Sequence, residues 1–222
     1  MSRAPYIALE GAEGSGKSTQ ARRLAAAIGA VLTQETGGTE VGRRLRAVLH
    51  DNGLVDLDPR AEALIAAADR AQHLAEVVIP ALTAGRPVVS DRSVYSTLAY
   101  QGHGRQLDVD ELRRLNDWAT RGVWPGLVVF IEASADVVAA RLGRRQLDRF
   151  EAAGDEFHSR VLAGYRAMAA ADPDRWIVVD TSSLDDGRID AGAVGTAGSI
   201  DDVAAAVLAA VTARFPELGA SH

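Results

Sequence analysis

The stretch from Gly11 to Thr19, GAEGSGKST, combines glycines, hydroxyl side chains and a lysine. It fits the pattern G-x-x-x-x-G-K-[ST], in which successive backbone N–H groups bind phosphate oxygens. Lys17 is expected to bridge the β- and γ-phosphates, and Ser18 is expected to ligate Mg²⁺. The expected nucleotide-binding residues are Gly11, Ala12, Glu13, Gly14, Ser15, Gly16, Lys17, Ser18 and Thr19. The pattern predicts ATP or GTP with magnesium, and it leaves open which molecule receives the phosphate.

Glu13 is an unusual residue for such a loop. A carboxylate beside bound phosphates is unfavourable unless it faces another group, such as a hydroxyl or the hydrated magnesium. The alternative is a solvated loop residue without a role. No arginine lies between Gly11 and Gly16, so additional positive charge for a transition state must come from elsewhere in the chain.

A second set of candidate residues lies in SDRSVYSTLAYQG, residues 90–102. Asp91 and Arg92 follow a predicted strand, at the end where open α/β sheets bind ligands. Asp91 can hold a magnesium-bound water, and Arg92 can form a fork on a phosphate; the alternative is an N-cap aspartate with a surface arginine. If a helix follows, one of its faces carries Ser96, Thr97, Tyr100 and Gln101. Such a face suits a sugar and a base.

Further arginines could serve the same site. Arg70 lies one helical turn after Ala66 and could reach the same crevice, or it could pair with Asp69 and solvent. The segment RLGRRQLDRFE, residues 141–151, would form a basic stripe in helical register from Arg141, Arg144, Arg145 and Arg149. Such stripes are usually solvated. In a chain with a net charge of −6, however, a local cluster of four arginines favours a phosphate-binding role.

Five short apolar runs indicate buried parallel strands, because they are rich in Val, Ile and Leu and do not alternate. The predicted strands are 6–10, 30–33, 87–90, 127–132 and 176–180. The predicted helices are 18–28, 39–49, 59–82, 93–100, 108–120, 135–145, 148–171 and 200–214. This alternation predicts a doubly wound α/β domain. Residues 181–199 are rich in Gly, Ser and Asp and are expected to form a loop.

Composition narrows the possible classes of protein. The 222 residues are 47% hydrophobic, enough for one large domain over residues 1–222. The chain has no cysteine, which excludes disulfides and cysteine-based zinc sites. The net negative charge disfavours nucleic acid as a partner, and no apolar run approaches about 20 residues. We therefore expect a cytoplasmic protein with neither nucleic-acid nor membrane partners.

The segments EGAEGSGKSTQ, GGTEVGRRLR, AADRAQH, SDRSVYSTLAYQG and LDRFE…GDEFHSRVLAGY resemble, in this order, the bacterial thymidylate kinase family. The resemblance covers nearly the whole chain and leaves out residues 181–199. It implies a five-stranded parallel sheet flanked by helices, the P-loop nucleoside monophosphate kinase fold, with a small lid at about residues 141–151. It also implies a homodimer that transfers the γ-phosphate of MgATP to dTMP, giving dTDP and ADP.

The resemblance also gives roles to individual residues. Arg92 would bind the dTMP phosphate, and Asp91 would act with Ser18 at the metal. The other residues implied in substrate binding are Glu13, Glu35, Arg46, Ala66, Arg70, Ser96, Thr97, Tyr100 and Gln101. Of these, Glu13 would face the 3′-hydroxyl. The catalytic arginine would come from the lid, from Arg145 or Arg149, with Arg141 and Arg144 near the donor nucleotide.

Departures from the family pattern keep other functions open. The family typically has REPGGT where this chain has QETGGT, so Gln34 and Thr36 replace an arginine and a proline. The aromatic ring that usually stacks on thymine is replaced by Ala66. One alternative is a kinase for another pyrimidine monophosphate, such as dUMP or a hydroxymethyl pyrimidine nucleotide. Another is a slow ATPase switch or binding module, which predicts no acceptor-stimulated turnover.

Overall fold

The computed structural model describes residues 4–133, 148–181 and 199–219. At its centre is a parallel sheet in the order β2-β3-β1-β4-β5. Its strands are β1 (Tyr6–Glu10), β2 (Val31–Gln34), β3 (Val88–Asp91), β4 (Leu127–Glu132) and β5 (Trp176–Asp180). The predicted fold class is confirmed, with β2 and β3 each beginning and ending one residue later than predicted.

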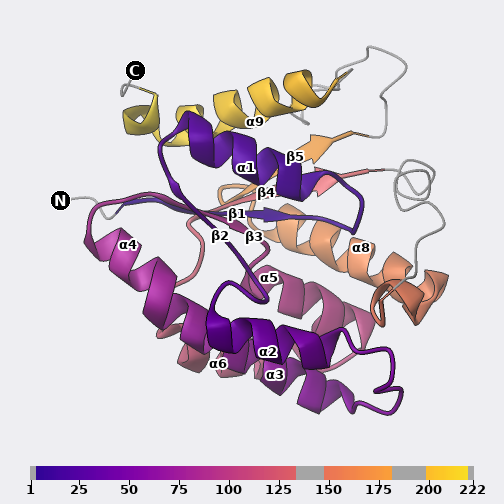
Figure 1. Cartoon of the computed structure of the whole chain (residues 1–222). Coiled ribbons are helices and arrows are strands. Elements are labelled where there is room, and N and C mark those ends of the chain that lie inside the picture. Colours follow the sequence, from indigo (N-terminus) through magenta and orange to yellow (C-terminus); the bar gives the residue numbers. More distant parts are fainter. Residues whose placement is uncertain (1–3, 134–147, 182–198, 220–222) are drawn as a thin grey trace.

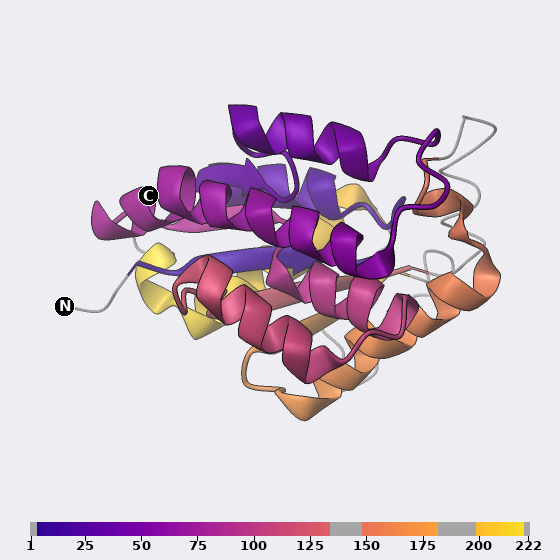
Figure 2. The same ribbon diagram turned by 90° about the horizontal axis from the view of Figure 1, so that it is seen from below.

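Helices cover both faces of the sheet (Figure 1). They are α1 (Lys17–Ala27), α2 (Glu40–Leu49), α3 (Pro59–His73), α4 (Ile79–Thr83), α5 (Val94–Thr97), α6 (Val109–Thr120), α8 (Asp155–Ala171) and α9 (Ile200–Arg214). Helices α1 and α9 lie on one face, and the others lie on the opposite face. Figure 2 shows the second layer from below, with α2 beside α3 and α3 beside α6.

Several helices differ from their predicted form. The predicted helix 59–82 contains a π-helical turn, Leu74–Val78, between α3 and α4. The predicted helix 93–100 is α5 followed by a π-helical turn, Leu98–Gly104. The predicted helix 148–171 begins only at Asp155. A short 3₁₀ turn, Glu151–Ala153, precedes it, and Gly154 between the two has a positive φ of 89°, which is incompatible with a continuous α-helix. The predicted helix 135–145 lies outside the described residues.

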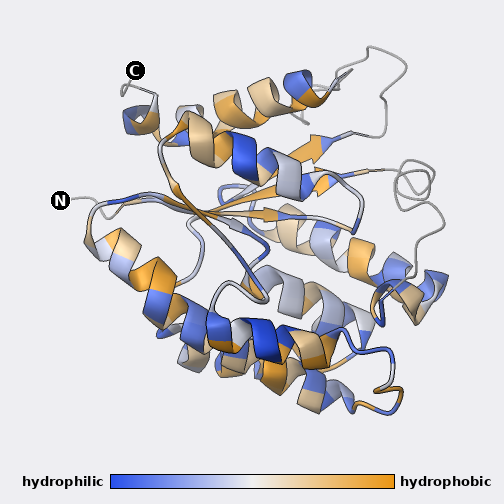
Figure 3. Cartoon of the chain, in the orientation of Figure 1, coloured by the Kyte–Doolittle hydropathy of each residue, from blue (hydrophilic) through white to orange (hydrophobic). Residues whose placement is uncertain are grey.

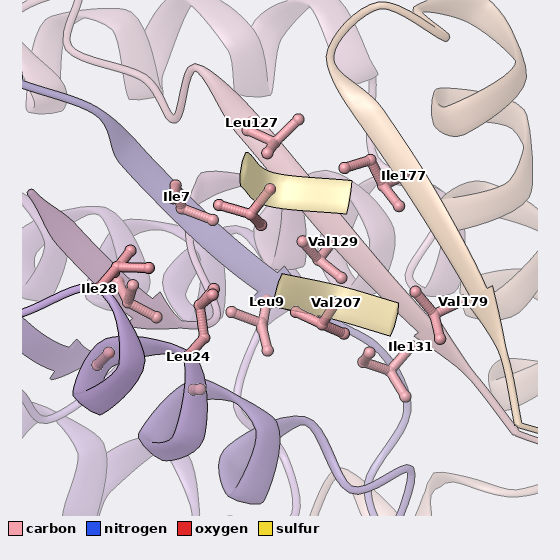
Figure 4. Close-up of a cluster of buried hydrophobic side chains, with 14 of the residues drawn as sticks. Ile7, Leu9, Leu24, Ile28, Leu127, Val129, Ile131, Ile177, Val179 and Val207 are labelled. Atoms are coloured by element: carbon pink, nitrogen blue, oxygen red, sulfur yellow. The ribbon is translucent and has the colours of Figure 1, made fainter. Parts of the chain in front are cut away.

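Apolar side chains hold the layers together. On one face, Leu24 of α1, Ile28 directly after α1, and Val207 of α9 pack on the strands (Figure 4). On the other face, Phe130 of β4 stacks on Tyr165 of α8, with ring centroids 5.2 Å apart. Hydrophobic residues concentrate in the strands (Figure 3), as expected for a sheet covered on both faces. Among the described residues, no helix is long and apolar enough to cross a membrane.

Candidate active site

The phosphate-binding loop follows β1, the central strand of the sheet. Its first residue, Gly11, has φ of 152°, and a Cβ atom there would lie 2.5 Å from the carbonyl oxygen of Ile131. Only glycine fits this position without moving β4. Gly16 precedes the first residue of α1, and the first turn of α1 has no acidic side chain. The positive end of the helix therefore faces the loop with no carboxylate in its own first turn.

Lys17 is the only lysine in the chain, and it lies almost completely buried under the loop. Its Nζ donates a hydrogen bond to the carbonyl oxygen of Ala12 (3.3 Å) and lies 3.5 Å from Oε2 of Glu13. Burial lowers the pKa of this ammonium group, and Glu13 and Asp91 oppose that shift. A compact ammonium at this point can exchange its carbonyl partner for phosphate oxygens.

The candidate metal ligands Ser18 and Asp91 line one cavity beside the loop. The buried Oδ1 atom of Asp91 has no hydrogen-bond partner among the described residues. A buried carboxylate oxygen without a partner is costly unless it meets a cation or water. Carboxylate and hydroxyl oxygens are the ligands that Mg²⁺ prefers, so these two residues fit a magnesium ion.

Arg92 lies where β3 ends, and its backbone is left-handed with φ of 71°. This conformation is uncommon for a residue with a side chain. It directs the guanidinium group toward the loop, where Nη2 donates to Oε1 of Glu13 (2.6 Å) and to the hydroxyl of Tyr100 (3.2 Å). Nη1 donates to Ser96 and Tyr165. The group is thus fixed from four sides and presents a planar fork to the cavity.

Glu13 joins the two cationic groups. One carboxylate oxygen contacts Arg92 and the other lies near Lys17. Arg92 is the main reason why the pKa of Glu13 lies far below its ordinary value, and Lys17 acts in the same direction against burial. Because the carboxylate of Glu13 contacts both groups, Lys17 of the phosphate-binding loop and Arg92 at the end of β3 are neighbours.

The depressed pKa of Glu13 predicts how its contribution to stability depends on pH. An unfolded glutamate has a pKa of about 4.3, so the stabilisation is complete above that value and is lost as pH falls toward the lower folded pKa. We expect Glu13→Gln to lower Tm at neutral pH, with a difference from wild type that shrinks below about pH 4. Thermal unfolding at pH 7 and pH 3 measures this. Glu40→Gln, at an exposed site on α2, is the control, and a Tm difference for Glu13→Gln independent of pH contradicts the assignment.

A cavity adjoins Arg92, with about 570 Å³ of empty space that is partly open to solvent. All residues predicted to bind the substrate line it: Glu13, Glu35, Arg46, Ala66, Arg70, Arg92, Ser96, Thr97, Tyr100 and Gln101. They come from the phosphate-binding loop, from the residues that follow β2 and β3, and from α2, α3, α5 and the π-helical turn after α5. The structure therefore brings together side chains that are distant in sequence.

Arg70 forms the polar end of this cavity. It is buried, and its Nε donates to Oε2 of Glu35 (2.8 Å) while Nη2 donates to Thr97 (3.1 Å). The alternative pairing with Asp69 and solvent is wrong, because Asp69 accepts a hydrogen bond from the backbone N–H of Gly37 instead. Burial alone raises the pKa of Glu35, but Arg70 and His73 hold it below its ordinary value. A charged, fixed guanidinium is therefore available at the cavity wall.

Other residues of the site were not identified from the sequence. Tyr165 donates to Oε2 of Glu10 (2.9 Å), and Glu10 also accepts from Ser93 and Ser96. Burial raises the pKa of Glu10. The sequence did offer one signal for Glu10, because it is the only charged residue in the predicted strand 6–10. Leu49, His50 and Phe150 also line the cavity, and their spacing in the sequence gives no such signal.

The arginines of residues 141–151 correspond only in part to the prediction. Arg149 does not continue a helical stripe, because it lies in a turn before α8. Its Nη2 donates to Oε2 of Glu62 (2.7 Å), and its Nε donates to the carbonyl oxygen of Leu49 (3.1 Å). Arg141, Arg144 and Arg145 lie outside the described residues, so the arrangement of these arginines at the donor phosphates stays a prediction.

A phosphate-binding loop after the central strand, beside a second cavity that holds an arginine and a polar helix face, defines a P-loop nucleoside monophosphate kinase. The family model of thymidylate kinase matches residues 9–186. The chain is 45% identical to a thymidylate kinase of Solidesulfovibrio magneticus over 86% of this chain and 98% of that protein. It is 49% identical to one of Leifsonia xyli over 80% of this chain and 87% of that protein.

The solved structures agree with these sequence relatives. A thymidylate kinase from Ehrlichia chaffeensis superposes with a TM-score of 0.72 at 28% identity, covering 95% of this chain and 100% of that one. The chain belongs to the thymidylate kinase family. It is a phosphotransferase that uses a nucleotide as phosphate donor, and the predicted resemblance is confirmed.

Proposed function

We propose that this protein transfers the γ-phosphate of MgATP to dTMP, giving dTDP and ADP. The observation that carries the proposal is the position of Glu13 between Lys17 and Arg92. If Lys17 binds the γ-phosphate and Arg92 binds the phosphate of the acceptor, the two reacting groups lie next to each other. Adjacent, oriented phosphates are what in-line transfer requires.

Each residue has a limited task in this scheme. Lys17 and the N–H groups of the loop bind the donor phosphates, and Arg92 orients the acceptor phosphate, whose oxygen is the nucleophile. Because that oxygen is already anionic, no strong general base is needed. Ser18 and Asp91 would hold the magnesium ion, which neutralises charge on the donor phosphates when bound. Arg145, or Arg149 after movement from Glu62, would add positive charge from the lid and help to exclude water.

The rest of the acceptor would occupy the cavity beyond Arg92. Arg70 would donate to a carbonyl of thymine, with Thr97 and Gln101 at the base. Tyr100 would lie against the sugar where a ribonucleotide has its 2′-hydroxyl. On arrival of the acceptor phosphate, Glu13 would leave Arg92 and accept a hydrogen bond from the 3′-hydroxyl. Glu13 would thus have a function both in the free enzyme, as a partner of Arg92, and in the complex with the acceptor, as a partner of the 3′-hydroxyl.

Phe150 would provide the aromatic wall that Ala66 lacks. Both residues line the cavity, and the Phe150 ring packs edge-on against Tyr100 and His50, with centroids 5.9 and 5.3 Å away. We expect Phe150→Leu to raise KM for dTMP about fivefold, the value of one aromatic contact, with little change in kcat. Steady-state kinetics measure this. Phe215→Leu, in the core on the opposite face of the sheet, is the matched control, and an unchanged KM for Phe150→Leu contradicts the assignment.

A coupled ADP-release assay with a panel of acceptors tests the function. We expect turnover to be fastest with dTMP and slower with dUMP, dCMP and purine monophosphates. A clear preference for another acceptor overturns the choice of dTMP. ADP release that is independent of any acceptor instead supports an ATPase switch.

We also propose that the protein acts as a cytoplasmic homodimer, as the family resemblance implies. Leu64 on α3 and Trp118 on α6 are exposed, by 56% and 82%, on two helices that pack side by side (Figure 2). We expect the contact between the two subunits to cover these side chains. Light scattering coupled to size-exclusion chromatography measures the oligomeric state.

A further inference from the structure

We infer that Glu62 is a positioning residue that fixes the side-chain amide of Gln101 and thereby sets which base edge the cavity accepts. The inference rests on the proposed function and adds a specificity determinant to it. Glu62 is fully buried on α3, at i−4 to Ala66 and i−8 to Arg70. These spacings place all three side chains on one face of the helix. Glu62 itself does not line the substrate cavity, so it acts through its neighbours.

The contact with Gln101 determines the orientation of the amide. One end of the Gln101 amide lies 2.7 Å from Oε1 of Glu62. Glu62 also accepts at Oε2 from Nη2 of Arg149 (2.7 Å) and Nη2 of Arg105 (3.2 Å), and Nε of Arg105 makes a longer hydrogen bond to Oε1 (3.4 Å). A carboxylate paired with two guanidinium groups has only acceptor oxygens. The amide end that faces it must therefore be the NH₂ group of Gln101.

The carbonyl oxygen of Gln101 is consequently presented to the cavity. Gln101 lines that cavity, and among the described residues its side chain makes a hydrogen bond through Nε2 only. An acceptor at this point matches a base that carries N–H on its ring edge, as thymine and uracil do at N3. Cytosine has an unprotonated N3, which would place two acceptors against each other.

Arg70 supplies the hydrogen-bond donor that complements the Gln101 acceptor in recognising the base. Its guanidinium can only donate, and Glu35, Thr97 and Asn116 fix its orientation. A donor beside an acceptor fits the C4 carbonyl and N3–H of thymine and opposes the C4 amino group and N3 of cytosine. Because a buried polar mismatch is costly, fixing both side chains gives strong discrimination between these bases.

The variant Glu62→Gln tests the inference. Oε2 meets the Nη2 atoms of both Arg149 and Arg105, at 2.7 and 3.2 Å, whereas the only guanidinium contact at Oε1 among the described residues is the longer one from Nε of Arg105 (3.4 Å). The carbonyl oxygen of a glutamine would therefore remain at the Oε2 position, and its NH₂ group would face Gln101. The Gln101 amide would then have to rotate and present NH₂ to the base. We expect the ratio of kcat/KM for dTMP to that for 5-methyl-dCMP to fall by about tenfold or more. The two acceptors differ only at C4 and N3, so the ratio reports this edge of the base.

Two further variants separate positioning from general stability. Glu62→Asp keeps an acceptor-only side chain, and we expect it to retain the selectivity ratio even if overall activity falls. Arg105→Lys removes the long Nε contact to Oε1 and changes one partner of Oε2, but it leaves the direct hydrogen bond between Glu62 and Gln101, and we expect a ratio like that of wild type. An unchanged ratio in Glu62→Gln, with both acceptors reduced equally, overturns the inference, as does equal loss of the ratio in Glu62→Gln and Glu62→Asp. Absence of dTMP turnover in the wild type instead overturns the proposed function.

Discussion

Replacement of Lys17 by alanine is expected to lower kcat for dTMP phosphorylation by at least about 10²–10³-fold, the cost of removing one fixed charge-stabilising donor. Lys17 is buried, and its ammonium group lies under the loop that would hold the β- and γ-phosphates. Since every other basic side chain except histidine is an arginine, no second lysine can replace it. A water molecule in its place would carry no positive charge to stabilise the transferred group.

The experiment for Lys17 must separate catalysis from folding and acceptor binding. Coupled ADP release at saturating ATP and dTMP gives kcat, and calorimetric titration with dTMP gives the affinity for the acceptor. We expect dTMP affinity to change much less than kcat, because Arg92 and Arg70 hold the acceptor. A Tm within a few degrees of wild type excludes unfolding as the cause. Turnover close to that of wild type would show that Lys17 does not bind the transferred phosphate.

The sequence predicted those parts of the molecule that depend on local pattern. The phosphate-binding pattern from Gly11 to Ser18 has a fixed spacing, and the strands are continuous apolar runs, so both were identified, the strands with bounds correct to within one residue. The residues predicted to contact the acceptor all line one cavity. That success came from the family resemblance, because spacing alone could not show that α2, α3 and α5 converge.

Features that depend on packing between distant segments could not be predicted in this way. The π-helical turn Leu98–Gly104 sets the positions of Tyr100 and Gln101, but its residues fit an α-helix equally well. Glu62 reads as an ordinary charged residue in the first turn of a helix. Its function becomes visible only when residues 39 and 87 positions away, Gln101 and Arg149, are brought to its two oxygens.

Arg92 is the second residue whose replacement should have a large effect. We expect Arg92→Lys to lower kcat/KM for dTMP by about 10³-fold, through a higher KM and a lower kcat together, because lysine keeps the charge but loses the planar fork. A single ammonium group cannot replace a guanidinium that also contacts Glu13, Ser96, Tyr100 and Tyr165. The acceptor phosphate would then be held with a wider range of orientations, and misorientation lowers the rate of an in-line reaction.

The separate effects of Arg92→Lys on kcat and on KM distinguish orientation of the acceptor phosphate from simple attraction of its charge. If Arg92 only attracted the acceptor phosphate, lysine would serve nearly as well, and saturating dTMP would restore kcat. If it orients the nucleophilic oxygen, kcat stays low at any concentration of dTMP while KM for ATP stays near the wild-type value. Arg43→Lys, at an exposed site on α2, is the matched control for the substitution. Full recovery of kcat at high dTMP would assign Arg92 to binding alone and would leave orientation of the nucleophile to Ser96, Tyr100 and the other groups that surround it.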